Sequence, residues 1–363
     1  MVEPRPELSK LSDYVPGKSI EEIRERFGLA KVVKLASNEN PLGASPKAVE
    51  AFHQIADSLH LYPRGDAPKL IDTIAKKYGV KTNQIVIGNG SDEIIDMVGK
   101  AFIRQGDNCV GITPTFSVYK FTTLSNGADF IGVGEGENKT SLDELAKAVN
   151  EKTRVAFICN PNNPTGAYYT EAEIRNFLKK VPQNVLVFLD EAYSEFATAE
   201  DYPNMSAALD EFPNLFVNRT FSKIYGLAGL RVGYAMGSVE VIRALWKIKP
   251  PFDVNQAAQV AAIAALGDEE HVQNTRKMNA DGVKVLTDVF ESYGFKVLPT
   301  QANFICVRIG EHAKDLVAFL EKNGMIIRGL TSFGMPEHVR ITVGKPEENA
   351  FLLELVKKWK AEA

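Results

Sequence analysis

The sequence lacks the features of a membrane-spanning or nucleic-acid-coating protein. Its longest stretch without a charged residue or histidine covers residues 155–170 and contains Pro161 and Pro164. A spanning helix needs roughly 20 apolar residues, so none is predicted. Neither charge sign dominates, because 42 lysines and arginines oppose 46 aspartates and glutamates and leave a net charge of −4. We therefore expect neither a membrane nor a nucleic acid as a partner.

Cysteine and histidine are also scarce. The three cysteines, Cys109, Cys159 and Cys306, lie far apart among apolar neighbours, which indicates reduced structural thiols. The five histidines show no HExxH spacing and no CxxC occurs, so no metal is predicted. The first residues, MVEPRPELSK, carry prolines and charges where a secretory signal has a continuous apolar segment. We expect a cytoplasmic protein.

Apolar residues, in contrast, are plentiful. They make up 45% of the 363 residues, enough for about two domains with cores of their own. From residue 85 to 237, short β-branched runs alternate with stretches whose apolar residues recur every three or four positions. This alternation is typical of an α/β domain with a parallel sheet between helices. The predicted strands are 85–88, 108–112, 128–133, 154–159, 185–189, 214–219 and 232–236, and the predicted helices are 91–103, 141–149 and 170–180.

The C-terminal third has another pattern. Residues 254–293 lack proline and are rich in alanine, valine and leucine, which predicts two helices, the second long enough to connect two domains. The apolar segments 295–298, 303–309, 325–328 and 338–343, with helices at 312–323 and 346–361, suit a small α+β domain. We predict an N-terminal arm at 1–35 that packs with the small domain, a large domain at 36–265, an interdomain helix at 266–293 and a small domain at 294–363.

Four polar motifs follow predicted strands, at the edge where open α/β sheets bind ligands. In 88-GNGSDE-93 a strand ends in glycines and a helix begins at Ser91, so free N–H groups could bind a phosphate. A simple strand-to-helix turn would look the same, and the third glycine of a dinucleotide fingerprint is missing. In 160-NPNNPTG-166 a rigid turn presents asparagines, which could equally bond their own backbone.

The other two motifs carry ionisable groups. In 190-DEAY-193, Asp190 ends an apolar strand, where it either caps the next turn or meets a ligand cation. In 218-NRTFSKIYGLAGLRVGY-234, Ser222, Lys223 and Arg231 lie in one glycine-rich loop. A lone lysine on a loop is usually solvated. A hydroxyl, an amine and a guanidinium gathered in this way can instead converge on one anion.

Together the motifs suit a ligand with a phosphate, an aldehyde that an amine can capture, and a ring nitrogen that a carboxylate can keep protonated. Pyridoxal 5′-phosphate (PLP) has all three. With these motifs in this order, the sequence resembles the fold-type I PLP-dependent aminotransferases over essentially its whole length. The resemblance implies an α/β fold like that of aspartate aminotransferase. Its large PLP-binding domain has a mostly parallel sheet flanked by helices, and its small domain is α+β.

Within that group the sequence is most similar to the histidinol-phosphate aminotransferase family. The motifs that carry this similarity are 13-DYVPG-17, 35-LASNENPLG-43, 61-LYP-63, 88-GNGSDE-93 and 338-HVRITVG-344. One departure follows 61-LYP-63, where Arg64 stands in place of the acidic residue and glycine that are common in the family.

The resemblance also implies which residues bind the cofactor. Lys223 would hold it covalently and act as general acid and base, with its pKa lowered by burial and by Arg231. Asp190 would pair with the ring nitrogen, while Tyr193 and Asn163 would hydrogen-bond the phenolic oxygen. The catalytic residues would thus be Lys223, Asp190 and Tyr193. The remaining cofactor contacts would be Phe116 on the ring face and, at the phosphate, Ser91, Asp92, Ser222, Arg231 and Tyr62.

For the substrates, the resemblance implies that Arg340 binds the carboxylate of glutamate in one half-reaction. Arg328 and Tyr14 would help it to bind the phosphate of the other substrate, and Asn163 would also contact the substrate. Tyr62 would come from the neighbouring subunit, so the resemblance implies a homodimer with shared active sites.

The implied activity is that of a transaminase of histidine biosynthesis, which interconverts L-histidinol phosphate plus 2-oxoglutarate and imidazole-acetol phosphate plus L-glutamate. One alternative is an aromatic aminotransferase acting on phenylalanine or tyrosine, and another is a PLP-dependent decarboxylase of a phosphorylated amino acid. A PLP-binding transcription regulator is disfavoured because the first 35 residues contain no helix-turn-helix pattern. The incomplete glycine fingerprint disfavours a dinucleotide-dependent dehydrogenase.

Overall fold

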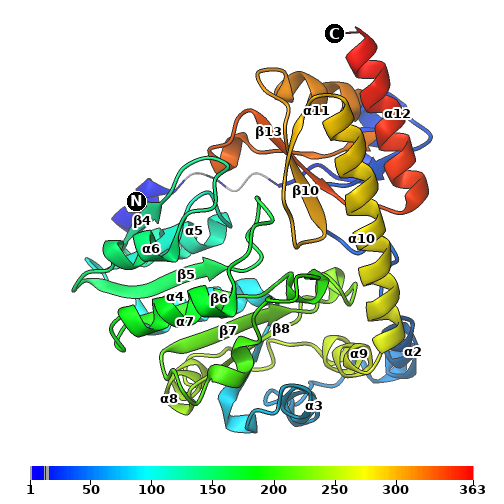
Figure 1. Ribbon diagram of the computed structural model, residues 1–363. Coiled ribbons are helices and arrows are strands. Elements are labelled where there is room, and N and C mark those ends of the chain that lie inside the picture. The colour runs from blue at the N-terminus through cyan, green and yellow to red at the C-terminus, as the bar shows by residue number, and fades with distance from the viewer. Residues whose placement is uncertain (1, 12, 14–15, 363) are drawn as a thin grey trace.

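A seven-stranded mixed sheet forms the centre of the larger part of the molecule (Figure 1). The computed structural model describes residues 2–11, 13 and 16–362. The strand order is β2-β8-β7-β6-β5-β3-β4, and every neighbouring pair is parallel except those of β8, which runs antiparallel to β2 and β7. The strands are β2 (Ile85–Gly88), β3 (Asn108–Ile112), β4 (Asp129–Val133), β5 (Thr153–Cys159), β6 (Leu186–Asp190), β7 (Leu215–Thr220) and β8 (Gly233–Gly237).

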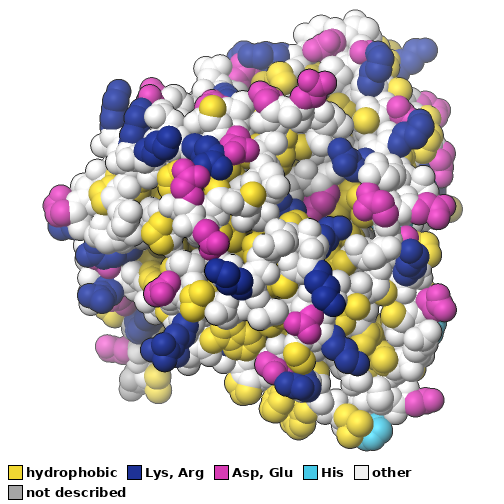
Figure 2. Space-filling model, turned by 60° about the horizontal axis from the view of Figure 1, so that its bottom comes forward, with side chains coloured by type: hydrophobic (Ala, Val, Ile, Leu, Met, Phe, Trp, Pro, Cys, Tyr) yellow, Lys and Arg dark blue, Asp and Glu magenta, His cyan; other side chains and the backbone are white. Residues whose placement is uncertain are grey.

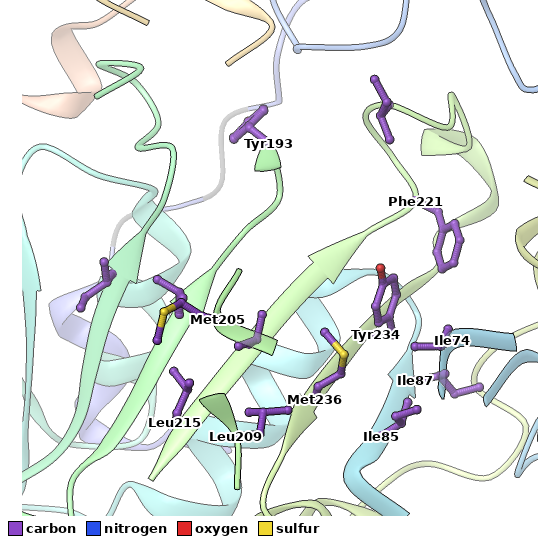
Figure 3. Close-up of a cluster of buried hydrophobic side chains, with 14 of the residues drawn as sticks. Ile74, Ile85, Ile87, Tyr193, Met205, Leu209, Leu215, Phe221, Tyr234 and Met236 are labelled. Atoms are coloured by element: carbon purple, nitrogen blue, oxygen red, sulfur yellow. The ribbon is translucent and has the colours of Figure 1, made fainter. Parts of the chain in front are cut away.

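Helices cover both faces of this sheet, because the side chains of each strand alternate between two cores. On β5, Ala156 and Ile158 belong to the core beneath α3, α6, α7 and α9, whereas Val155 and Phe157 belong to the core beneath α4, α5 and α8. Figure 3 shows part of the first core, where Ile85 and Met236 from the sheet face Ile74 of α3. These helices are α3 (Pro68–Tyr78), α4 (Ser91–Phe102), α5 (Ser117–Ser125), α6 (Leu142–Ala148), α7 (Glu171–Lys180), α8 (Val239–Trp246) and α9 (Gln256–Leu266); α2 (Pro46–Gln54) packs against α9.

The smaller part is built on an antiparallel sheet of order β12-β13-β10-β9. Its strands are β9 (Lys296–Leu298), β10 (Phe304–Arg308), β12 (Arg328–Gly329) and β13 (His338–Thr342), and its helices are α11 (Ala313–Lys322) and α12 (Pro346–Glu362). Both predicted helices between 254 and 293 are present, as α9 and as α10 (Glu269–Ser292). Figure 1 shows α10 running from the neighbourhood of α2 and α9 to α12. The predicted fold class, a mostly parallel sheet flanked by helices plus a small α+β part, is therefore confirmed.

The N-terminal segment contacts both parts of the molecule. Strand β1 (Val33–Lys34) pairs in parallel with β11 (Met325–Ile326) of the smaller part. Nearer the terminus, Arg5 donates a hydrogen bond to the carbonyl of Ser125 on α5 at 2.8 Å. The domain boundaries stay a prediction.

The remaining elements are α1 (Ile20–Phe27) and the 3₁₀ turns η1 (Pro6–Lys10), η2 (Ala56–Ser58), η3 (Thr82–Gln84), η4 (Ser194–Phe196), η5 (Met205–Ala208), η6 (Ala228–Leu230) and η7 (Thr331–Phe333).

None of the helices within 2–11, 13 and 16–362 combines the length and the apolar character that a membrane crossing requires.

Candidate active site

Most of the predicted site residues meet in one cavity of about 450 Å³. It lies where β5, β6 and β7 end, and β12 and β13 of the smaller sheet supply its other wall. This is the edge at which open α/β sheets bind ligands. The predicted residues that line the cavity are Ser91, Asp92, Phe116, Asn163, Asp190, Tyr193, Ser222, Lys223, Arg231, Arg328 and Arg340.

Asp190, the last residue of β6, is the buried carboxylate of this cavity. Its Oδ2 accepts a hydrogen bond from the Tyr119 hydroxyl at 2.7 Å, and its Oδ1 accepts from the Asn218 amide and the Ala192 N–H, each at 3.2 Å. Burial raises the pKa of Asp190 to about 6, and the bond from Tyr119 is the largest opposing effect. The carboxylate is therefore largely ionised at neutral pH and can bind a cation in the cavity.

The neighbouring carboxylate, Glu191, has different surroundings. Its Oε2 accepts a hydrogen bond at 2.9 Å from Nε of Arg219, and both side chains are buried. Glu191 does not line the cavity. Of the two carboxylates in the DEAY motif, therefore, only Asp190 is placed to meet a ligand, and Glu191 has a structural ion pair with Arg219.

Lys223 lies in the loop after β7, close beneath the N-terminal LASNENPLG segment. The loop turns at Gly226, which has a φ of 69°, and a Cβ there would lie 2.0 Å from the carbonyl oxygen of Gly43. The Lys223 ammonium donates to the carbonyl of Ser37 at 3.1 Å. Burial and, after it, the charge of Arg340 lower the pKa of Lys223 from 10.5 to about 8. Arg231, the cation expected from the sequence, also acts in this direction but ranks after Arg340 among the causes.

A cradle for an anion lies at the other end of the cavity, where α4 begins. Arg231, with a φ of 52°, reaches across Gly90, and its Nη2 donates to Asp92 at 3.2 Å. A Cβ on Gly90 would lie 2.5 Å from Nη2 of Arg231, and one on Gly233 would lie 2.7 Å from the N–H of Ser91. Glycine at these two positions lets a guanidinium and a helix N-terminus approach each other. That combination suits a phosphate group.

Tyr193 and Asn163 occupy the wall between these ends. The Tyr193 hydroxyl accepts a hydrogen bond at 2.9 Å from the amide of Asn38, a residue that the sequence analysis did not single out. Burial raises the pKa of Tyr193 to about 12, while Arg340 is the largest effect lowering it, so the hydroxyl stays protonated and can donate. The Asn163 carbonyl oxygen accepts from Arg340.

Arg340 is a buried cation without an acidic partner. Only 6% of the residue is exposed, and it forms no salt bridge with any residue of the described chain. Its guanidinium donates to Asn163 and, at 2.7 Å, to the carbonyl of Ala36, while its Nε is buried without an acceptor. Arg328 lies directly opposite it on the neighbouring strand. Two cations facing each other across a ladder repel, so an anion between them would be stabilising.

The three other aromatic residues predicted at the site, Phe116, Tyr62 and Tyr14, differ in their relation to the cavity. Phe116 lines the cavity, with its ring centre 5.6 Å from that of Tyr119. Tyr62 does not line it: its side chain is 83% exposed and stacks on Phe252. Tyr14 lies outside the described residues. In a single chain, then, the structure does not bring Tyr62 to the cavity.

The sequence analysis missed three polar residues around this site, Asn38, Tyr119 and Asn218. Asn38 and Asn218 lie within the quoted motifs LASNENPLG and NRTFSKIYGLAGLRVGY, and Tyr119 follows the predicted Phe116 by three residues. Asn218 lies two residues before the end of β7, a central strand of the sheet. A polar residue so near the end of a central strand could have been predicted to lie close to the site. The partners of Asn38 and Tyr119 are distant in sequence, and no local pattern points to them.

Comparison with known proteins agrees with this geometry. The model of the aminotransferase class I and II family matches residues 30–356. A histidinol-phosphate aminotransferase of Moorella thermoacetica is 44% identical over 98% of this chain and 92% of its own length. One of Brevibacillus brevis is 43% identical over 98% of both chains. The chain therefore belongs to the class I and II aminotransferases, and among these to the histidinol-phosphate aminotransferase family.

Solved structures resemble the chain over its whole length. The crystal structure of histidinol-phosphate aminotransferase from Sinorhizobium meliloti in complex with pyridoxal 5′-phosphate has a TM-score of 0.91 at 25% identity, covering 100% of this chain and 99% of that one. An aspartate aminotransferase double mutant of Thermus thermophilus has a TM-score of 0.84 at 19% identity, covering 99% and 100%. The second likeness concerns the fold alone.

Proposed function

We propose that the protein is a PLP-dependent aminotransferase that interconverts L-histidinol phosphate plus 2-oxoglutarate and imidazole-acetol phosphate plus L-glutamate, in the histidine biosynthesis of the cytoplasm. The observation that carries the proposal is the unpaired Arg340 guanidinium in the same cavity as a lysine of lowered pKa and a buried carboxylate. Such a site suits a cofactor aldehyde that Lys223 can capture and a substrate that presents an anionic group to Arg340. The names of the relatives support the same substrate.

The described residues fit the cofactor. The glycine-lined cradle of Arg231 and Ser91 suits its phosphate, Asp190 its ring nitrogen and Lys223 its aldehyde. When bound, PLP supplies an electron-withdrawing ring that makes the Cα proton of the substrate more acidic. Ser222 would add a hydroxyl to the cradle, Tyr193 and Asn163 would hold the phenolic oxygen, and Phe116 would lie on the ring face.

Lys223 would move the proton at the substrate Cα. With a pKa of about 8, about a tenth of the Lys223 side chains are free amines at pH 7, far more than for an ordinary lysine, and this favours a general base. Asp190 would hold a proton at the ring nitrogen because its carboxylate is aimed into the cavity by donors behind it. Arg340 orients the substrate through its anionic group, so that Cα lies within reach of Lys223.

The two half-reactions place different anions at the same end of the cavity. Glutamate brings a carboxylate, which a guanidinium can bind through two parallel hydrogen bonds. Histidinol phosphate carries a phosphate ester on a CH2 group in place of that carboxylate. We infer that Arg328, opposite Arg340 on the adjoining strand, adds the second cation that a phosphate needs. The sequence prediction gives Tyr14 the same role.

Turnover of alternative substrates tests the proposal directly. Purified protein loaded with PLP is assayed with histidinol phosphate, phenylalanine and tyrosine as amino donors and 2-oxoglutarate as acceptor. We expect the highest kcat/KM for histidinol phosphate. A preference for phenylalanine or tyrosine would make the protein an aromatic aminotransferase, and release of carbon dioxide from a phosphorylated amino acid without amino transfer would make it a decarboxylase.

We further propose a homodimer in which Tyr62 reaches the cofactor phosphate of the neighbouring subunit. Tyr62, Leu59, Leu61 and Phe252 are 83%, 56%, 58% and 46% exposed. Figure 2, which brings the end with α3 and α9 forward, shows apolar side chains gathered among charged ones on that face. Exposed apolar patches mark interaction surfaces, and a second copy of this chain would cover this one.

Hybrid dimers test the shared site. Subunits carrying Tyr62→Phe are mixed with subunits carrying Lys223→Ala, each of low activity alone. In a mixed dimer, one site combines an intact Lys223 with an intact Tyr62, so part of the wild-type activity should return. Mixing that restores nothing, while sedimentation shows mixed dimers, would contradict the shared site.

A further inference from the structure

Three protein donors surround the carboxylate of Asp190, and one of them is much closer than the others. The Tyr119 hydroxyl lies 2.7 Å from Oδ2, whereas the Asn218 amide and the Ala192 N–H each lie 3.2 Å from Oδ1. Hydroxyl-to-carboxylate bonds of this length are charge-assisted and stronger than neutral ones. A carboxylate offers about four acceptor sites, so three donors leave room for one more, from the cavity.

Packing fixes the position of the Tyr119 ring. The residue has no exposed surface, and its ring stacks on Phe157 with centres 4.8 Å apart and planes 9° apart. The Phe116 ring meets it edge to face, 5.6 Å away. Phe116 is the residue immediately before α5, and Tyr119 is the third residue of that helix. The start of α5 thus places an aromatic ring of the cavity wall against the ring of the closest donor to Asp190.

The hydrogen bond from the Tyr119 hydroxyl lowers the pKa of Asp190. Burial raises the pKa of Asp190, and the hydrogen bond from Tyr119 is the largest influence that lowers it. The pKa of Tyr119 is itself raised well above its usual value, by burial and by Asp190, so the hydroxyl remains a donor. The carboxylate is thus held ionised and in one orientation.

We propose that Tyr119, assisted by Asn218, is a positioning residue that orients Asp190 and keeps it ionised, so that the proton shared with the cofactor ring stays on the ring nitrogen. This inference rests on the proposed function, because it concerns the ring nitrogen of PLP. Without the Tyr119 hydroxyl, the buried carboxylate binds a proton more strongly. Asp190 would then hold more of the shared proton, so less positive charge would remain on the ring.

The test uses Tyr119→Phe, which keeps the ring and its stacking and removes only the hydroxyl. Tyr169→Phe is the matched control: Tyr169 is also buried, and its hydroxyl donates to the carbonyl of Thr140 at 2.6 Å, outside this cavity. Each holoprotein is prepared with PLP labelled with ¹⁵N in the ring, and the ¹⁵N shift is followed against pH. Cofactor affinity and kcat and KM for the amino donor are measured alongside.

In wild type and Tyr169→Phe the ¹⁵N shift should be that of a protonated ring at neutral pH. In Tyr119→Phe it should move toward the neutral ring, kcat should fall about 10-fold or more, and KM should change little, since a lost bond to a charged group has an effect of this size. Asn218→Ser should move the shift in the same direction by less, and it serves as the test should Tyr119→Phe not fold. Unchanged shifts in these variants would overturn the inference. Absence of PLP binding by wild type would instead overturn the proposed function.

Discussion

Arg340 offers a test in which stability and activity should change in opposite directions. The guanidinium is 6% exposed, has no acidic partner in the described chain, and leaves its Nε without an acceptor. Burial lowers its pKa, and the neighbouring Arg328 lowers it further. A charge in this situation weakens the fold of the ligand-free protein, while the same charge is what binds the substrate anion.

The contacts of Arg340 set the size of the expected change in the free energy of unfolding. Burying a charge costs several kcal/mol even after relaxation. The hydrogen bonds to the carbonyls of Ala36 and Asn163 return about 1.5–3 kcal/mol each. In Arg340→Met the methionine fills much of the space, and both carbonyls can bind water in the cavity. We therefore expect the free energy of unfolding of the apoprotein to rise by about 1–3 kcal/mol.

Denaturant unfolding of the apoprotein at pH 7 measures this gain, and Arg340→Lys is the control that keeps the charge without the planar fork. Enzyme assays of the holoprotein should show kcat/KM lower by about 100-fold or more in Arg340→Met, for glutamate and histidinol phosphate alike. An anionic substrate at 100 times its Kd should stabilise wild type by about 2.7 kcal/mol and the methionine variant hardly at all. The reasoning is refuted if Arg340→Met destabilises the apoprotein by more than about 1 kcal/mol while keeping its kcat/KM.

The remaining predictions concern Lys223 and Asp190. The pKa of Lys223 is lowered from 10.5 to about 8, so its folded form binds a proton less well than the unfolded chain. The wild-type apoprotein should therefore gain up to about 3 kcal/mol of stability between pH 8 and 10.5 relative to Lys223→Met, as denaturant titrations at several pH values would show. The pKa of Asp190 is raised from 3.8 to about 6, so wild type should lose up to about 3 kcal/mol relative to Asp190→Asn as pH rises from 4 to 6. At neutral pH, kcat of Asp190→Asn should fall at least 100-fold, because an amide cannot stabilise a positive ring. Borohydride reduction and peptide mass spectrometry should find the cofactor on Lys223, and Lys223→Ala should lose it while its circular dichroism stays unchanged.

Strand positions could be predicted closely, because the central strands are buried on both faces and read as short apolar runs between polar turns. All seven strands of the large sheet begin and end within one residue of the predicted bounds. The antiparallel direction of β8 was not predicted, since an apolar run carries no sign of its direction. Helices α2, α3, α5 and α8 were also missed. For α5 the physical reason is plain: Phe116 precedes it without a side-chain cap, so the usual start signal is absent. Ala67 gives α3 no cap either, but Pro68 at its first position was a signal that could have been used.

The site could be predicted as far as it depends on strand ends. Asp190 is the last residue of β6, and Ser222 follows β7. These two strands are parallel neighbours, so their carboxyl ends lie at the same edge of the sheet. The bonds from Tyr119 to Asp190 and from Asn38 to Tyr193 join residues 71 and 155 positions apart. Such contacts depend on how helices and sheets pack, which a single sequence does not specify. Tyr62 illustrates a further limit, because its predicted partner belongs to another chain.

The charges of the cavity explain why ligand binding and stability should be linked in this protein. Lys223, Arg340 and Arg328 line the cavity together, and the pKa values of Lys223 and Arg340 are lowered partly by cation neighbours. In the same cavity Asp190 is a buried carboxylate whose pKa is raised by burial. Each group is therefore held in a protonation state that the empty cavity disfavours. A ligand with a cationic ring at Asp190 and an anion at Arg340 would remove both penalties at once, so the geometry that weakens the free protein is the geometry that selects this kind of ligand.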